Sequence, residues 1–312
     1  MTDSRAVSRP TAATMLSKVP EVTIYFWIIK VLCTTVGETF SDNLASQFNL
    51  GTAKLAMIFG VLLAVVLAFQ FRARRYVPGI YWLAVVLLSV EGTLITDNLT
   101  DVQNVALSTT TILFSILLAL TFIGWYVSEK TLSIHSIITT RREAWYWTAI
   151  LFTFALGTAS GDYLSEKLNT YSNAVLVFGA AIAVITLLHF TVGTRHGQSR
   201  RVESNAVLAF WAAYILTRPL GASIGDFLSL KNPDDNPHAG GIGLGTTVTS
   251  AIFLSAILLL VIYLSITRRD EIEIDPATGD VIHEAGVGYD HRPGHEHHHG
   301  HEYAEHHRAD EE

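Results

Sequence analysis

Residues 27–44 read WIIKVLCTTVGETFSDNL, and this stretch contains the spacing W-x9-G-x4-D-x-L. The same spacing returns three more times, each time within an otherwise apolar stretch. We call this four-residue motif the phrase. A motif that recurs in this way makes the repeat, rather than the single residue, the unit of folding. The four copies are Trp27, Gly37, Asp42, Leu44; Trp82, Gly92, Asp97, Leu99; Trp147, Gly157, Asp162, Leu164; and Trp211, Gly221, Asp226, Leu228.

The composition indicates a membrane protein. Half of the 312 residues are hydrophobic and only 16% are charged, whereas roughly 25% are charged in a typical soluble domain. The apolar segments are continuous and do not alternate with polar residues, which excludes barrel strands and leaves helices. Each is long enough to cross a hydrocarbon core, which needs ~20 helical residues. We therefore expect an all-α integral membrane fold with eight transmembrane helices, at about 20–44, 52–71, 78–99, 104–127, 143–166, 172–193, 204–230 and 243–267.

Basic residues fall on one side of this eight-span chain. They follow the second, fourth, sixth and eighth spans, as in Arg72, Arg74 and Arg75, while the opposite loops hold only Lys54, Lys167 and Lys231. The positive-inside rule then places both termini in the cytoplasm of a bacterial inner membrane. We expect a cytoplasmic tail at 1–19, a transmembrane domain at 20–267 and a disordered cytoplasmic His-rich tail at 268–312.

Each repeat is a pair of spans, with boundaries at about 20–75, 76–140, 141–203 and 204–267. Because each unit crosses twice, all four point the same way and form parallel repeats, an arrangement known in transporters. The pattern favours a pseudo-symmetric bundle with the phrase-bearing helices inside, although two separate four-helix halves are also compatible with it.

The Trp and Gly of the phrase have alternative interpretations. The Trp is either an interfacial anchor or a large packing residue. The Gly either lets helices approach closely or breaks the helix just before the acid.

The four Asp residues are the candidate site. Acids within spans are expensive and usually mark ion or proton pathways, while an Asp near a helix end can also be a turn residue that meets water. In three repeats a second acid lies four residues away on the same helical face. The candidate metal ligands are Asp42, Asp97, Asp162 and Asp226, with Glu38, Asp101 and Glu166 as their partners. Lys30 and Arg218, also within spans, are either counter-ions of the empty site or snorkelling or structural side chains.

Two sets of ligands point to different metals. The phrase is rich in carboxylate, hydroxyl and amide oxygens, which favour a hard ion such as Mn. The tail adds imidazoles, which favour Zn, Ni or Co, or it is a solvated tail without specific function. Its candidate ligands are His295, His297, His298, His299 and His301.

The four two-span repeats, each with a Trp, and the opening KVPEVTIYFWIIKVLCTTVGETFSDNL (residues 18–44) resemble an uncharacterised bacterial family of membrane proteins. That family is described as a four-fold repeat of two transmembrane segments. The resemblance covers about residues 18–267 and implies the eight-span architecture. VGETFSD (36–42) and SGDYLSE (160–166) are also similar to acidic motifs of divalent cation exchangers, with different spacings.

We expect transport of a divalent metal cation, with Mn favoured, by export in antiport with protons. The partners are then the lipid bilayer, divalent cations and protons, with no nucleic acid and no required cofactor, in a monomer or homodimer. A metal or stress sensor or scaffold without transport is an alternative. An enzyme acting on a lipid or quinone is another, although no nucleophile elbow or HExxH motif is present and we do not expect an enzyme.

Overall fold

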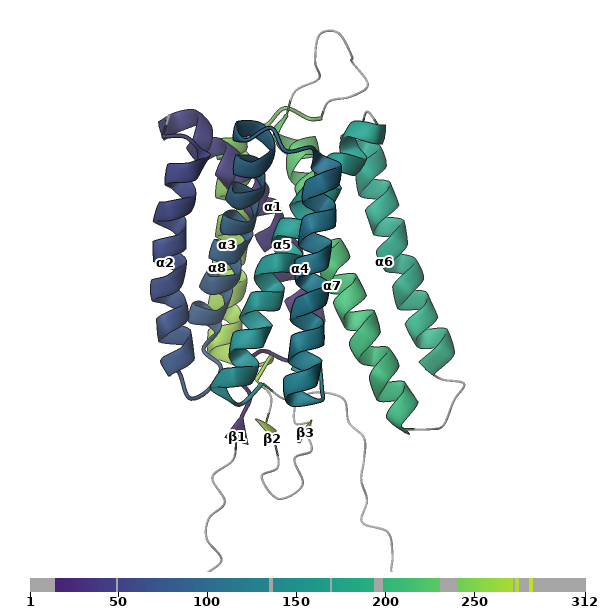
Figure 1. Ribbon diagram of the computed structural model, residues 1–312. Coiled ribbons are helices and arrows are strands. Elements are labelled where there is room, and N and C mark those ends of the chain that lie inside the picture. Colours follow the sequence, from purple (N-terminus) through teal and green to yellow (C-terminus); the bar gives the residue numbers. More distant parts are fainter. Residues whose placement is uncertain are drawn as a thin grey trace, which may run out of the picture.

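The computed structural model describes residues 15–48, 50–134, 137–168, 170–193, 199–230, 241–271, 273–274 and 281–282. Eight long helices run side by side along the bundle (Figure 1). One π-helical turn follows the third helix, and three short strands lie before the first helix and after the last one. The helices are α1 (Ile24–Phe48), α2 (Thr52–Arg72), α3 (Pro78–Asp97), α4 (Leu107–Glu129), α5 (Thr140–Leu168), α6 (Tyr171–Gly193), α7 (Ser199–Ser229) and α8 (Thr246–Thr267); the π turn η1 covers Asn98–Val102.

The phrase-bearing helices form a closed inner ring. Helix α1 lies against α3 and α7, and α5 lies against the same two helices. Each of the other helices packs on the phrase-bearing helix that follows it, so that α2 lies on α3, α4 on α5, α6 on α7, and α8 on α1. The contact of α8 with α1 completes this order around the bundle. The bundle is therefore not two separate four-helix halves.

Six of the helices in the described chain are long and apolar enough to cross a membrane: Thr52–Arg72, Pro78–Val102, Leu107–Glu129, Tyr171–Thr191, Asn205–Ser229 and Thr246–Thr267. Helices α1 and α5 are not among these six, and each carries buried charged side chains, such as Lys30 and Glu38 in α1 and Glu143 in α5. The outer helices expose apolar side chains, such as Val65 and Ile112. The prediction of an all-helical, multi-pass membrane fold is thus confirmed at this coarser level.

The glycine of the phrase marks the contact between neighbouring helices of the ring. A Cβ at Gly221 would lie 1.9 Å from Thr34 Oγ1, and one at Gly37 would lie 2.0 Å from Ser89 Oγ. Gly92 and Gly157 approach α5 and α7 in the same way. Each glycine therefore lets its helix touch the next one, and the close-packing interpretation is confirmed. The alternative of a helix break is wrong, because α1, α3, α5 and α7 continue through these positions.

The tryptophan of the phrase belongs to a ring of aromatic pairs. An aromatic residue precedes each Trp, and its ring contacts the Trp of the next repeat. Trp82, Trp147 and Trp211 are buried, and Trp27 is partly buried, so the packing interpretation holds rather than the interfacial anchor. The ring centroids are 5.6 Å apart for Phe26–Trp82, 5.4 Å for Tyr81–Trp147, 6.3 Å for Tyr146–Trp211 and 5.7 Å for Phe210–Trp27.

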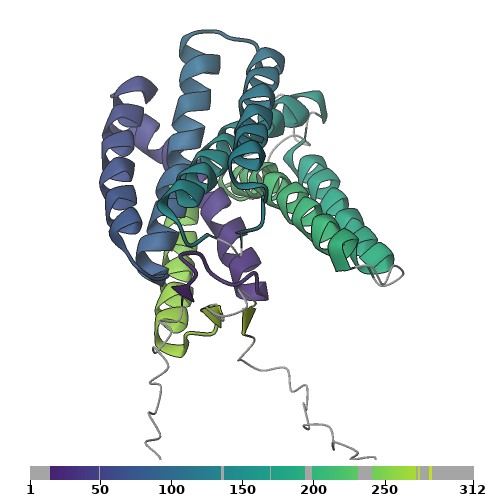
Figure 2. The ribbon, with the colours of Figure 1, turned by 60° about the horizontal axis from the view of Figure 1, so that its bottom comes forward.

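Both ends of the described chain meet at one end of the bundle, as an even number of helices running in alternating directions requires. Strand β1 (Met15–Leu16) pairs with β2 (Glu273–Ile274), which pairs with β3 (Val281–Ile282); Figure 1 shows them below the helices. Buried Lys18 forms an ion pair of 2.7 Å with Glu143. Packed structure thus extends beyond the expected boundaries at residues 19 and 268. In Figure 2 this end of the bundle comes forward.

Candidate functional site

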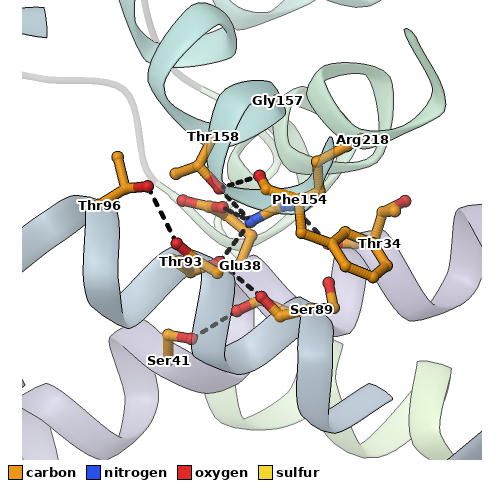
Figure 3. Close-up of polar contacts among 12 residues, drawn as sticks. Thr34, Glu38, Ser41, Ser89, Thr93, Thr96, Phe154, Gly157, Thr158 and Arg218 are labelled. Atoms are coloured by element: carbon orange, nitrogen blue, oxygen red, sulfur yellow. Dashed lines mark hydrogen bonds and ion pairs between the residues drawn. The ribbon is translucent and has the colours of Figure 1, made fainter. Parts of the chain in front are cut away.

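Arg218 lies at the centre of the inner ring. Its side chain is fully buried, and its Nη2 lies 2.9 Å from Glu38 Oε2 on α1 and 2.8 Å from Thr158 Oγ1 on α5. The same nitrogen contacts the hydroxyl of Thr93 on α3, and Nη1 donates a hydrogen bond of 3.1 Å to the carbonyl of Thr34. Figure 3 shows these groups turned toward the guanidinium. One arginine from α7 therefore connects all four helices of the ring.

The spacing within the phrase explains why these residues meet. The residue after each glycine is buried in all four repeats, and so is the residue three positions before each glycine. Because the glycines hold the helices at contact distance, the earlier residue of each repeat lies against the glycine of a neighbouring helix, and the later residue of the first three repeats contacts Arg218. The later position holds Glu38, Thr93, Thr158 and Ala222, and the earlier one holds Thr34, Ser89, Phe154 and Arg218.

A cluster of carboxylates lies beside the ion pair. One oxygen each from Glu38, Asp42 and Asp226 can be chosen so that all three lie within 4.8 Å of one another. We call these three residues the carboxylate trio. Glu38 and Asp42 are one turn apart on α1, and Asp226 comes from α7, which packs on α1. Three of the predicted ligands are thus brought together from the first and last repeats.

The other two aspartates lie close to the trio. The charges of Asp97 and Asp162 each interact with those of Glu38 and Asp42, and all four aspartates of the phrase are partly buried. Their negative charges repel one another and are opposed locally by Arg218. Such a region attracts cations.

The remaining predicted ligands are more peripheral. Asp101 and Glu166 are both exposed, although the charge of Asp101 still interacts with those of Asp42, Asp97 and Asp162. Asp101 lies in η1, where the α-helix that carries Asp97 gives way to a π turn. Single π turns of this kind often accompany functional sites. His295, His297, His298, His299 and His301 lie outside the described residues.

The two basic residues within the helices have different partners. Arg218 pairs with the carboxylate of Glu38, as both the counter-ion and the structural ion-pair interpretations predict. Lys30 is also fully buried, but its Nζ lies 4.0 Å from the ring centroid of Phe154 and 4.2 Å from that of Tyr214. Its ammonium has no hydrogen-bond partner among the described residues, and its closest aromatic contacts are of the cation–π type.

Sequence reasoning treated the threonines of the phrase as oxygen donors for a metal ion and missed their contact with Arg218, and it missed the aromatic pairs. Thr93 and Thr158 directly follow the glycine of their repeats, as Glu38 does. Aligning the four phrases column by column would have placed these residues in one layer. The doublets of Phe or Tyr followed by Trp would have appeared in the same alignment.

The comparisons with known proteins agree with the repeat pattern. A family model described as Repeat of Unknown Function (DUF347) matches the chain four times, at residues 25–76, 80–131, 145–194 and 209–270. These matches confirm the four predicted repeats. Searches of curated proteins and of solved structures gave no match. The similarity to cation exchangers therefore has no support beyond the motifs themselves.

Proposed function

Because the chain belongs to the family of the Repeat of Unknown Function (DUF347), its activity has to be inferred from its site, and we propose that it transports a divalent metal cation across a membrane. The observation that carries this proposal is the carboxylate trio, held beside a buried arginine on the axis of the bundle. The finer architecture belongs to the same proposal: eight crossings related by pseudo-four-fold symmetry, in a bacterial inner membrane, with both termini cytoplasmic.

The chemistry of the trio favours a hard divalent ion. Three carboxylates within 4.8 Å repel one another strongly, and a divalent cation relieves this repulsion while replacing part of its hydration shell with their oxygens. These ligands favour Mn, whereas the histidines of the tail favour Zn, Ni or Co.

Arg218 serves as an internal substitute for the metal ion in this proposal. In the empty site its guanidinium neutralises Glu38 at 2.9 Å. An arriving ion competes for the same carboxylate, so binding releases Arg218, and departure of the ion restores the pair. A buried carboxylate without either partner is costly, and this cost drives the exchange in both directions.

Proton antiport follows from the same carboxylates. Metal binding requires deprotonated ligands, so each ion bound releases protons. A pH gradient can then drive the metal in the opposite direction. We propose export as this direction, because both termini and the metal-binding tail would face the cytoplasm.

The test is uptake of divalent ions by proteoliposomes under an imposed pH gradient, with Mn, Zn, Ni and Co compared. Wild type should move one or more of these ions, and Asp226→Asn should not. Glu166→Gln is the matched control, because it also removes one acid near the same end but at an exposed position. If the chain moves no ion, or if the two variants behave alike, the proposal is wrong.

A further inference from the structure

Glu91 is a buried acid that the carboxylate site does not use. It lies in α3, near the middle of the apolar stretch Pro78–Val102, and only 8% of its surface is exposed. Its Oε2 has no hydrogen-bond partner among the described residues. A carboxylate without a partner at such a depth is strongly disfavoured in hydrocarbon.

The surroundings of Glu91 provide room but no opposite charge. Its Oε1 lies 3.4 Å from the position that a Cβ on Gly60 of α2 would occupy, so the glycine makes space for the carboxyl group. The charged residues of α2, Lys54 and Arg72, lie near its two ends, and α8 has none. On α1, Glu38 pairs with Arg218, Lys30 lies over two aromatic rings, and Asp42 belongs to the carboxylate trio. Helix α5 also packs on α3, and its charged residues lie toward its two ends: Arg141, Arg142 and Glu143, and Asp162, Glu166 and Lys167.

The fold itself does not require an acid at this position. Glu91 directly precedes the glycine of the phrase, and the other three repeats carry Val36, Leu156 and Leu220 there. Those repeats build the same helix contacts with an apolar side chain. An acid at this position is therefore specific to the second repeat, and it destabilises the fold relative to an apolar side chain there.

We propose that Glu91 is a proton-binding site within the membrane-spanning bundle, located between α2 and α3 and separate from the carboxylate trio. A proton fits the site better than a metal ion. A hard metal ion needs about six oxygen ligands, whereas the part of α2 beside Glu91 is the apolar run around Gly60, IFGVLL at residues 58–63. A proton needs no further ligand, and it makes the carboxyl group neutral in the apolar interface.

Labelling with a hydrophobic carbodiimide tests this proposal on the full chain in membranes. The reagent takes the proton of a carboxylic acid, and the carboxylate oxygen then adds to its central carbon. The adduct keeps all atoms of both partners and is located by mass spectrometry. We expect one major adduct at Glu91. Its yield should fall about tenfold for each pH unit above the midpoint of titration, relative to an exposed carboxyl group in the same sample.

Two variants make the result decisive. Glu91→Gln should lose the adduct, and Glu91→Leu should fold at least as stably as wild type, because leucine occupies this position in two other repeats. The proposal is overturned if Glu91 stays unlabelled at acidic pH, if its labelling does not change with pH, or if Glu91→Gln keeps the adduct. Labelling reports on Glu91 whether or not the chain moves a metal, so its outcome is independent of the transport proposal.

Discussion

Replacing Arg218 with methionine tests the energetics of the site directly. The variant keeps much of the apolar stem and removes the charge, leaving Glu38 buried without its partner at 2.9 Å. Because the arginine is fully buried, removing it should destabilise the fold by ~3–5 kcal/mol, the usual effect of breaking a buried pair on one side. Much of this loss comes from the uncompensated charge of Glu38.

The double variant Arg218→Met with Glu38→Gln separates that charge from the loss of packing. It removes both charges, so its stability should return close to that of wild type and well above that of Arg218→Met alone. Thermal unfolding in detergent, measured for wild type, both single variants and the double variant, gives the coupling between the two positions.

Added divalent metal provides a second signal in the same assay. In Arg218→Met the metal no longer competes with the guanidinium, so Mn should raise the unfolding temperature more than it does in wild type. Additive effects of the two substitutions, together with no gain in stabilisation by Mn, would refute the view that Arg218 stands in for the ion.

Three further outcomes are expected. Gly221→Ala should destabilise the fold by ~1–3 kcal/mol through overpacking, measured by thermal unfolding, whereas Gly79→Ala should have little effect because nothing lies within 4 Å of the added methyl group. Asp42→Asn should weaken Mn binding at least about tenfold in an equilibrium binding assay, since even indirect ligand contacts contribute that much, and Glu166→Gln, at an exposed position, should not. Burial raises the pKa of Asp270 above its ordinary value of 3.8, so the folded state binds this proton more tightly than the unfolded state, and stability falls as pH rises from about that ordinary value through the folded pKa. The Asp270→Asn variant should show a smaller fall in melting temperature over that range.

The sequence predicted the repeat architecture well because the phrase records the helix contacts themselves. Trp and Gly recur at a fixed spacing since each repeat presents the same residues to its neighbour in the ring. Lys18, just before the first span, looks from the sequence like a basic residue that meets water, but the structure buries it in an ion pair with Glu143. A single charged residue near a helix end does not reveal whether it meets water or a partner distant in sequence.

The membership of the site was harder to predict. Acids in register suggested a symmetric group of four, but the structure brings Asp42 and Asp226 together with Glu38, because α1 and α7 are adjacent when the ring closes. Helical spacing also suggested that Asp101 and Glu166 would join their neighbours, whereas both side chains are exposed. Spacing along one helix gives the face of a residue, but the order of helices around the axis decides which faces meet.

The most direct measurement is a structure of the protein with Mn bound, in which anomalous scattering locates the ion. The account predicts an ion coordinated by oxygens of Glu38, Asp42 and Asp226 at ~2.0–2.6 Å, with the guanidinium of Arg218 moved away from Glu38. An ion found only at the histidines of the tail, with the pair of Arg218 and Glu38 intact, would contradict it.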